Sequence, residues 1–228
     1  MKKHVAYLDL KTMGYHEAYE IQKLIFKLCD QNKIIDTIIF QENTPTITIG
    51  RSGTQDHLLL TIEELQQKGI DVIATDRGGD ITFHGPGQLV ISLILHVKAY
   101  TNNVHDYLRK LEEAAILLLS HYGIQAKTSV GLSGVWVNDH KIASIGIAVE
   151  HAITRHGIAI NVSPDLTYFN SIIACGIKDV TMTSIEKLTN ESIKMHDVKT
   201  TFLDAFEHVF ECTCIPAYLE KGTLEYEN

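Results

Sequence analysis

The chain has 228 residues, of which 45% are hydrophobic and 21% are charged, and it carries a formal net charge of −8 with a sequence pI of about 5.8. This composition is typical of a globular protein with an ordinary core, and the acidic balance disfavours nonspecific binding to nucleic acid or to anionic membranes. The apolar runs fall far short of the ~20 residues of a membrane span, and the N-terminal run from Val5 to Leu8 is too short for a signal-peptide core. We therefore expect a cytoplasmic enzyme with no nucleic-acid or membrane partner.

Three segments show the spacing of three and four residues between apolar side chains that predicts amphipathic helices. They lie at 18–28, 104–122 and 198–210, and Gly123 is the predicted C-terminal cap of the second. Their apolar stripes are Ala18, Ile21, Ile25 and Leu28; Val104, Leu108, Leu111, Ala115, Leu118 and Tyr122; and Val198, Phe202, Phe206, Val209 and Phe210.

Between these helices the sequence alternates apolar segments with turn residues, a pattern that predicts strands. Several strands follow one another without an intervening helix, which favours the α+β class with a mixed, largely antiparallel sheet flanked by helices. We find no repeat or linker and therefore predict a single domain spanning 1–228. The predicted strands are 4–8, 35–40, 46–50, 71–75, 80–84, 88–97, 134–138, 141–149 and 152–162.

The four cysteines, Cys29, Cys175, Cys212 and Cys214, lack the spacing of a disulfide framework. Cys212 and Cys214, with His208 before them, offer part of a zinc site but no fourth nearby ligand. We expect neither a metal nor a cofactor, and zinc at this motif is the less favoured alternative.

The segment RGGDITFHGPGQLV, at 77–90, sets a cation and an imidazole among glycines between two strand-like pieces. Its structural interpretation is a hairpin, turned at 78–79 and again at 85–87. The glycine pattern fits neither the dinucleotide-binding nor the P-loop fingerprint. A ligand-binding interpretation stays open beside the hairpin.

Two further residues are chemically suggestive in their local sequence. Lys141 opens an otherwise apolar strand, where the ordinary interpretation is an edge lysine with its charge in solvent. Cys175 follows an apolar run and precedes Gly176, where the ordinary interpretation is a buried inert thiol.

Taken in order along the chain, these segments resemble the lipoyl(octanoyl) transferases of lipoate biosynthesis. RGGxxTxHGPGQ stands at 77–88, GVWVxxxKIASIGI at 134–147, HGxAxNV at 156–162, and CGI followed by TSI at 175–177 and 183–185. The resemblance covers most of the chain from about residue 45 to about residue 188. The ordered set is far more specific than any one motif.

The resemblance implies the fold shared with biotin and lipoate ligases. It also implies an acyl-transfer reaction. An octanoyl group would move from the phosphopantetheine thioester of acyl carrier protein to a lysine of an acceptor. The acceptors would be lipoyl domains of 2-oxoacid dehydrogenases and the glycine cleavage H protein. By the motif match, Cys175 would be the nucleophile that holds the acyl group as a thioester, and Lys141 its activating partner. The residue types suit these roles, because the thiolate is the attacking species and a nearby ammonium favours it.

The resemblance also predicts where the substrate lies. Glycines let the backbone approach a ligand, and backbone amides near the cysteine are candidates for binding the oxyanion of the tetrahedral intermediate. His84 is given a structural or binding role, because the implied catalytic pair is Lys141 and Cys175. The expected substrate-binding residues are Arg77, Gly78, Gly79, Asp80, Ile81, Thr82, Phe83, His84, Ser144, Ile145, Gly146, Gly157, Ile158 and Ala159.

Two positions depart from the family pattern. Ser92 stands where a tyrosine is usual, and Ala174 stands where proline is often found before the cysteine. The first departure bears on the shape of the acyl slot and the second on the rigidity of the cysteine loop.

Two rival functions remain open. An ATP-dependent lipoate or biotin ligase would share the fold but would depend on ATP, and a non-catalytic carrier-binding module would not need Lys141 and Cys175. The protein partners are generally acidic, so a local basic patch is expected despite the net charge of −8. Its candidate residues are Arg51, Arg77, Lys141, Arg155 and Lys178.

Overall fold

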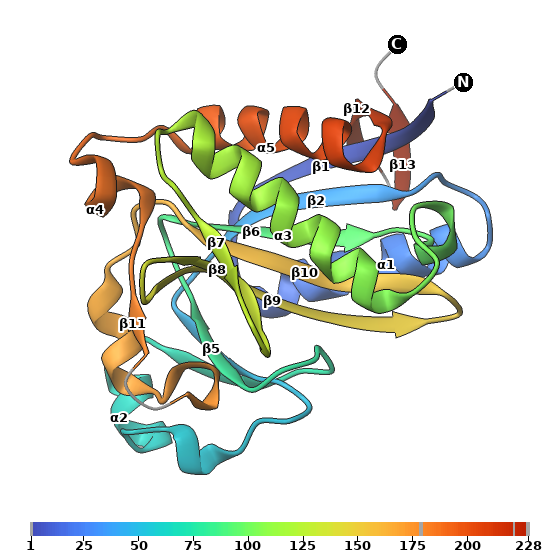
Figure 1. The fold of residues 1–228 in the computed structure, drawn as a ribbon. Helices are drawn as coiled ribbons and strands as arrows, with labels where there is room; N and C mark the ends of the chain where they lie inside the picture. The colour runs from blue at the N-terminus through green and yellow to red at the C-terminus, as the bar shows by residue number, and fades with distance from the viewer. Residues whose placement is uncertain (1, 178–179, 221, 227–228) are drawn as a thin grey trace.

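The computed structural model describes residues 2–177, 180–220 and 222–226. Its centre is a mixed sheet whose described strands follow the order β13-β12-β1-β2-β6-β10-β9-β8-β7, with β11 paired to β9 (Figure 1). The strands are β1 (Lys3–Met13), β2 (Thr37–Asn43), β6 (Gln88–Ile94), β7 (Lys127–Ser129), β8 (Leu132–Val137), β9 (His140–Glu150), β10 (Ile153–Asn161), β11 (Thr181–Met182), β12 (Cys212–Glu220) and β13 (Thr223–Tyr226).

The strand directions confirm the predicted mixed, largely antiparallel sheet. β1 runs parallel to both of its neighbours, β2 and β12. From β2 through β6, β10, β9 and β8 every neighbouring pair is antiparallel. Of these antiparallel strands, β8, β9 and β10 carry the motifs at 134–147 and 156–162.

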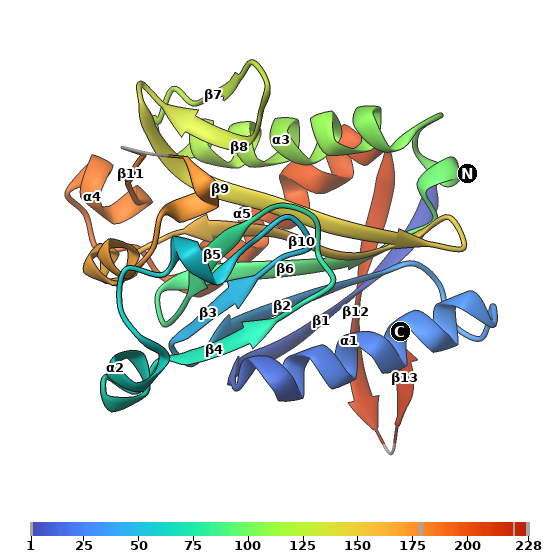
Figure 2. The same cartoon turned by 90° about the horizontal axis from the view of Figure 1, so that it is seen from below.

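Helices cover both faces of this sheet (Figures 1 and 2). α3 (Val104–His121) and α5 (Met195–Phe210) lie on one face, and α1 (Tyr15–Asp30) lies on the other. Short helices α2 (Ile62–Gln67) and α4 (Ile185–Thr189) sit in connections, as do the 3₁₀ turns η1 (Gln55–His57), η2 (Val97–Ala99), η3 (Leu166–Ser171) and η4 (Ala174–Gly176). Among the described residues, none of the helices is both long enough and apolar enough to cross a membrane.

The largest part of the core lies between the sheet and α3 and α5. The predicted stripe of α5 is confirmed in full, since all five of its apolar residues are buried. Leu111, Ala115 and Leu118 of α3 are buried as expected, and Gly123 adopts a φ of 70° just beyond the helix, consistent with its predicted role at the C-terminus. Aromatic packing joins the two helices, because Tyr107 meets Phe210 edge-on with ring centroids 5.9 Å apart.

The helix at α1 is confirmed, but its buried face differs from the prediction. Ala18 and Ile25 are buried, whereas Leu28 is only half-buried. The other buried positions of α1 are Tyr15, Gln22 and Cys29, of which Gln22 and Cys29 are a polar side chain and a thiol that an apolar-only pattern passes over. Gln22 turns out to face a ligand-sized cavity.

The hairpin interpretation of 77–90 is wrong. β5 (Ile81–His84) pairs with β3 (Thr46–Ile49), which also pairs with β4 (Asp71–Ala74), in a separate three-stranded sheet. β6, which follows β5 along the chain, belongs to the main sheet instead. The turn at 85–87 therefore links two sheets, and the second sheet lies on the same side of the main sheet as α1 (Figure 2).

Candidate active site

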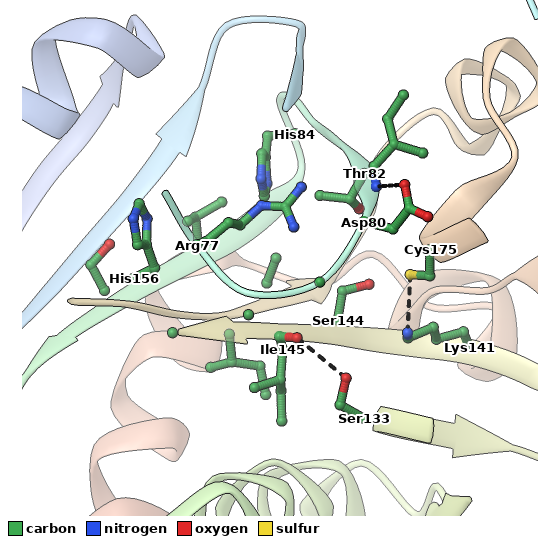
Figure 3. A pocket seen from close by; sticks show the side chains of 18 of the residues that line it. Arg77, Asp80, Thr82, His84, Ser133, Lys141, Ser144, Ile145, His156 and Cys175 are labelled. Atoms are coloured by element: carbon green, nitrogen blue, oxygen red, sulfur yellow. Dashed lines mark hydrogen bonds between the residues drawn. The ribbon is translucent and has the colours of Figure 1, made fainter. Parts of the chain in front are cut away.

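A cavity lies between the main sheet, β5 of the second sheet and α1 (Figure 3). Its volume is about 980 Å³, including space open to solvent. All of the expected site residues line it except Gly78 and Phe83. The Phe83 ring instead stacks on Tyr168, with centroids 4.7 Å apart, in the core of the second sheet.

Lys141 reaches this cavity because β9 contains a bulge. Val135 and Trp136 of β8 are consecutive, but they pair with Ala143 and Lys141 of β9, so Ile142 is an extra residue. The extra residue changes the alternation of side chains along β9, and Ile142 packs into the core while Lys141 turns to the cavity. The expectation of an edge lysine in solvent is wrong, since Lys141 is 2% exposed.

The side chain of Lys141 passes directly over Gly134 of β8. A Cβ atom at Gly134 would lie 2.8 Å from Lys141 Cε and 2.4 Å from the carbonyl oxygen of Ala143, and Gly134 has a φ of 111°. The amide of Gly134 donates to the buried carboxylate of Glu112 on α3, at 3.0 Å. Gly134 therefore provides the space for the lysine, and Glu112 of α3 anchors β8, the strand that carries Gly134.

The lysine ammonium meets the thiol of Cys175. Lys141 Nζ donates to Cys175 Sγ at 3.1 Å (Figure 3), and it also lies 5.3 Å from the centre of the Trp136 ring. Burial of an ammonium is costly unless a charge or dipole compensates. The thiol and the aromatic face are the partners that the described residues give it on the cavity side.

Cys175 lies in the 3₁₀ turn η4 with a φ of 59°, in the left-handed region that non-glycine residues rarely occupy. The turn is held by three backbone bonds, from Ile173 N to His57 O at 2.8 Å, from Gly176 N to Ile173 O at 3.0 Å and from Ile177 N to Ala174 O at 3.1 Å. The thiol is partly exposed and faces the cavity, so the interpretation as a buried inert thiol is wrong.

Asp80 and His57 support the same turn, and His57 was missed at the sequence level. The two side chains are hydrogen-bonded, with His57 Nδ1 2.9 Å from the carboxylate, and Ile81 N donates to Asp80 Oδ1 at 2.7 Å. A Cβ at Gly176 would lie 2.3 Å from Asp80 Oδ2, so the carboxylate packs directly on the backbone that follows Cys175. Asp80 is thus held mainly by protein contacts.

Arg77 places a buried positive charge in the middle of the cavity wall. Its guanidinium donates to the backbone oxygen of Thr48 at 2.7 Å and to the Thr48 hydroxyl at 2.8 Å. Burial lowers the pKa of Arg77, but a guanidinium stays protonated in proteins. The charge therefore persists and favours an anionic or polarised group in the cavity.

His84 is held as a neutral imidazole. Burial lowers its pKa to about 3, so the ring is uncharged in neutral solution. Its Nδ1 donates to Gln88 Oε1 at 2.7 Å, and the ring stacks on Tyr15 with centroids 5.7 Å apart. These contacts support the structural or binding role that was expected for His84.

The far part of the cavity is closed by α1, whose contribution was not predicted. Gln22 donates to the hydroxyl of Ser92 at 2.9 Å and accepts from His156 N at 3.0 Å. The His156 ring contacts Asp76 at 2.7 Å and stacks on Tyr19. Ser92, the position that departs from the family pattern, lines the cavity, and its hydroxyl is hydrogen-bonded to Gln22 of α1. Figure 3 shows His156 toward the opposite end from Cys175 and Lys141.

The glycines of β9 and β10 allow close contact between protein segments. A Cβ at Gly157 would lie 2.3 Å from the oxygen of Ile91, and one at Gly146 would lie 2.6 Å from the oxygen of Gly78. β10 also lies between β6 and β9, so sheet pairing occupies the backbone amides of 157–159. These amides are therefore poor candidates for an oxyanion site.

Two buried polar atoms of the cavity wall have no hydrogen-bond partner among the described residues. They are the hydroxyl of Thr82 and the side-chain oxygen of Gln41. Unpaired buried polar atoms are rare in native structures. Here they are available to the polar part of a ligand.

The less favoured zinc alternative is not supported by the described residues. His208, Cys212 and Cys214 do not form a group close enough to share a metal ion; among the described residues, the one such Cys, His and acidic group is Cys29, Asp36 and His96, outside the cavity lining.

The predicted basic patch is also not formed by its candidate residues. Arg77 and Lys141 are buried in the cavity wall, and Arg155 pairs with two carboxylates at 2.7 and 2.9 Å. Arg51 is exposed, and Lys178 lies outside the described residues.

Comparison with known proteins agrees with this geometry. Residues 14–207 match the family model of the lipoyl protein ligase A/B catalytic domain. An octanoyltransferase of Dictyoglomus thermophilum is 45% identical over 199 residues, which cover 87% of this chain and 84% of that protein. An octanoyltransferase of Clostridium kluyveri is 39% identical over 218 residues, which cover 96% and 93%.

The fold comparison points the same way. A bi-partite lipoate protein ligase from Thermoplasma acidophilum superposes with a TM-score of 0.74 at 14% identity, covering 97% of this chain and 89% of that one. This similarity confirms the predicted ligase-like fold. The sequence relatives and the family model together show that the chain belongs to the octanoyltransferases, acyltransferases built on the lipoyl protein ligase A/B catalytic domain.

Proposed function

We propose that this protein transfers an octanoyl group from acyl carrier protein to a lysine of a lipoyl-accepting protein, through a thioester on Cys175. The observation that supports it most directly is the 3.1 Å contact between Lys141 Nζ and Cys175 Sγ in the wall of a ligand-sized cavity. An ammonium at this distance favours the thiolate, which is the nucleophilic form of cysteine.

The first half-reaction exchanges one thioester for another. The Cys175 thiolate attacks the donor carbonyl, the bond from carbon to Cys175 sulfur forms, and the bond to the pantetheine sulfur breaks. The departing thiolate takes a proton from the Lys141 ammonium, which becomes a neutral amine. The acyl group is now held on the protein. Because one thioester has replaced another, the free energies before and after this step are nearly equal.

The second half-reaction forms the amide. The neutral amine of the acceptor lysine attacks the acyl-Cys175 carbonyl, and the bond to sulfur breaks as the amide forms. The attacking nitrogen loses a proton to the Lys141 amine, which restores the ammonium and thiolate pair. Amide formation from a thioester is downhill, so the sequence of steps needs no ATP.

The cavity wall offers both parts of the binding that an acyl thioester requires. Ile145, Ile158 and Val90 supply apolar surface, and burying the seven methylene and methyl groups of an octanoyl tail contributes at most ~5–6 kcal/mol before ordering costs. We infer that two groups of the wall stabilise the negative charge that develops on the carbonyl oxygen. The unpaired hydroxyl of Thr82 would donate a hydrogen bond to this oxygen, and Arg77 would contribute its fixed positive charge.

The expected acceptors are lipoyl domains of 2-oxoacid dehydrogenases and the glycine cleavage H protein. These partners, a cytoplasmic location and a single domain spanning 1–228 stay predictions. Because Arg77 and Lys141 are buried and Arg155 is paired with two carboxylates, we infer that docking relies on surfaces other than these three residues.

Octanoyl transfer from carrier protein should proceed at the same rate with and without ATP and magnesium, because the thioester already carries the acyl group in activated form. Free octanoate should not be attached to an acceptor domain, even with ATP. The measurement is acceptor modification by mass spectrometry, with apyrase and chelator in the ATP-free arm. Robust ATP-dependent attachment of free octanoate would instead assign the protein a ligase activity.

A further inference from the structure

A second cavity adjoins the first beside Cys175. Its described lining combines apolar side chains with neutral and charged polar ones, from β7, β8 and the segment after the cysteine turn. Leu132 and Ile177 line both cavities, and Ile177 is two residues beyond Cys175. The residues found in its wall but not in that of the first are Lys127, Ser129, Trp136, Asn138, Asp139 and Val180.

Trp136 connects this second cavity to the catalytic pair. It faces Lys141 across the pairing of β8 with β9, and the lysine ammonium lies over its ring at 5.3 Å. One side of the indole is therefore fixed by Lys141, while the residue also lines the second cavity. A molecule in this cavity would lie next to the place where the donor thioester is broken.

The indole nitrogen of Trp136 is buried and unsatisfied. The side chain is 5% exposed, and its Nε1 has no hydrogen-bond partner among the described residues. An indole N–H can only donate, and buried donors without a partner are rare in native proteins. The missing partner must present an acceptor, such as an amide carbonyl.

We propose that the second cavity binds the amide-bearing pantetheine arm of the donor thioester, with an arm carbonyl accepting from Trp136 Nε1. This inference rests on the proposed function. The arm is an uncharged chain in which methylene groups alternate with two amides. Leu132 and Ile177 suit its methylene groups, while Ser129 and Asn138 offer hydrogen bonds to its amides. Lys127 is exposed and suits the phosphodiester at the outer end of the arm.

The side chain of an acceptor lysine fits this cavity less well. It carries no amide carbonyl that could accept a hydrogen bond from the indole N–H. The chemistry of the wall thus favours the donor arm over the acceptor side chain.

Trp136 is the sole tryptophan of the chain, so tryptophan emission reports on the surroundings of this one side chain, which lies beside both Lys141 and the second cavity. Titration with pantetheine should shift or quench the emission, and so should carrier protein that bears the arm. Carrier protein lacking the arm should leave the emission unchanged. Unchanged emission at pantetheine concentrations that inhibit transfer would overturn the proposal.

A kinetic test uses two donors, S-octanoyl pantetheine and an octanoyl thioester of ethanethiol, which has no amide. Trp136→Phe keeps an aromatic ring beside Lys141 but removes the N–H. The ratio of kcat/KM for the two donors should fall by about threefold to tenfold, the size expected for one neutral hydrogen bond. Tyr218→Phe, at an exposed position of β12, is the matched control and should keep the ratio.

The outcomes separate the two proposals. An unchanged ratio overturns the second site in either of two forms. An equal loss with both donors would mean that Trp136 acts only by supporting Lys141, and no loss with either donor would mean that the indole N–H makes no contact with the arm that matters for transfer. Failure of the wild-type protein to transfer from both donors would count against the proposed function, while the emission titration would still decide whether the arm binds.

Discussion

Replacing Cys175 with alanine should reduce octanoyl transfer from carrier protein by about a thousandfold or more, the scale on which the loss of an enzyme nucleophile is felt. Without the thiol no acyl-protein can form, and the remaining cavity can only bind the substrate. The variant should fold, because the side chain is partly exposed and the turn is held by backbone bonds from Ile173 and Gly176. The measurement is the rate of acceptor octanoylation, with thermal unfolding as the check on folding.

Cys29→Ser is the matched control. Cys29 is fully buried on α1, and burial together with the nearby Asp36 carboxylate raises the pKa of its thiol to about 12, so it stays protonated in neutral solution. This substitution should leave the transfer rate nearly unchanged. If Cys175→Ala retained the wild-type rate, or if Cys29→Ser lost it, the assignment of the nucleophile would be wrong.

Replacing Lys141 with alanine should lower the transfer rate by about a hundredfold to ten-thousandfold, the range typical of a group that both donates and accepts the transferred proton. It should also slow the alkylation of Cys175 by iodoacetamide near neutral pH, because the contact at 3.1 Å no longer stabilises the thiolate. Lys68→Ala, at an exposed position after α2, is the control.

Lys141→Arg separates charge from proton transfer. A guanidinium keeps the positive charge but stays protonated and cannot serve as the proton acceptor. We therefore expect this variant to retain much of the alkylation rate and to lose most of the transfer rate. The lysine side chain passes close to the backbone at Gly134, so the larger arginine has little room there. Thermal unfolding must therefore show that the variant is folded. Unchanged alkylation and unchanged transfer in Lys141→Ala would rule out the pair.

The sequence was most informative where local patterns decide the structure. The stripe of α5 is apolar at every predicted position, so its periodicity found both the helix and its buried face. α2 and α4, with six and five residues, are too short to show such a period. β12 was missed because it contains Pro216, which weakens a strand pattern, although its parallel pairing with β1 includes that residue.

The hairpin interpretation failed for a different reason. β5 pairs with β3, far behind it in the sequence, and not with β6, which follows it after one turn. Local sequence identifies strands but not their partners when the partner is distant. The motif residues were nonetheless found, because their identities carry the resemblance independently of how the strands pair.

The site shows the same division. Cys175 and Lys141 were named from motifs. The bulge at Ile142, which turns the lysine into the cavity, could not be predicted in this way, because it depends on the register in which β9 pairs with β8. His57 was missed because its partner Asp80 is remote along the chain and the pair forms only in the fold. Gln22 was missed because a polar residue on a helix is ordinarily expected in solvent.

The most direct test of the account is the intact mass of the wild-type protein after incubation with octanoyl carrier protein and before any acceptor is added. The account predicts a gain of one octanoyl group, located on Cys175 by peptide mapping, absent in Cys175→Ala and lost again when an acceptor lipoyl domain is supplied. Acceptor octanoylation without any acyl-protein, or an acyl group found on Cys212 or Cys214 that is passed to the acceptor, would contradict it.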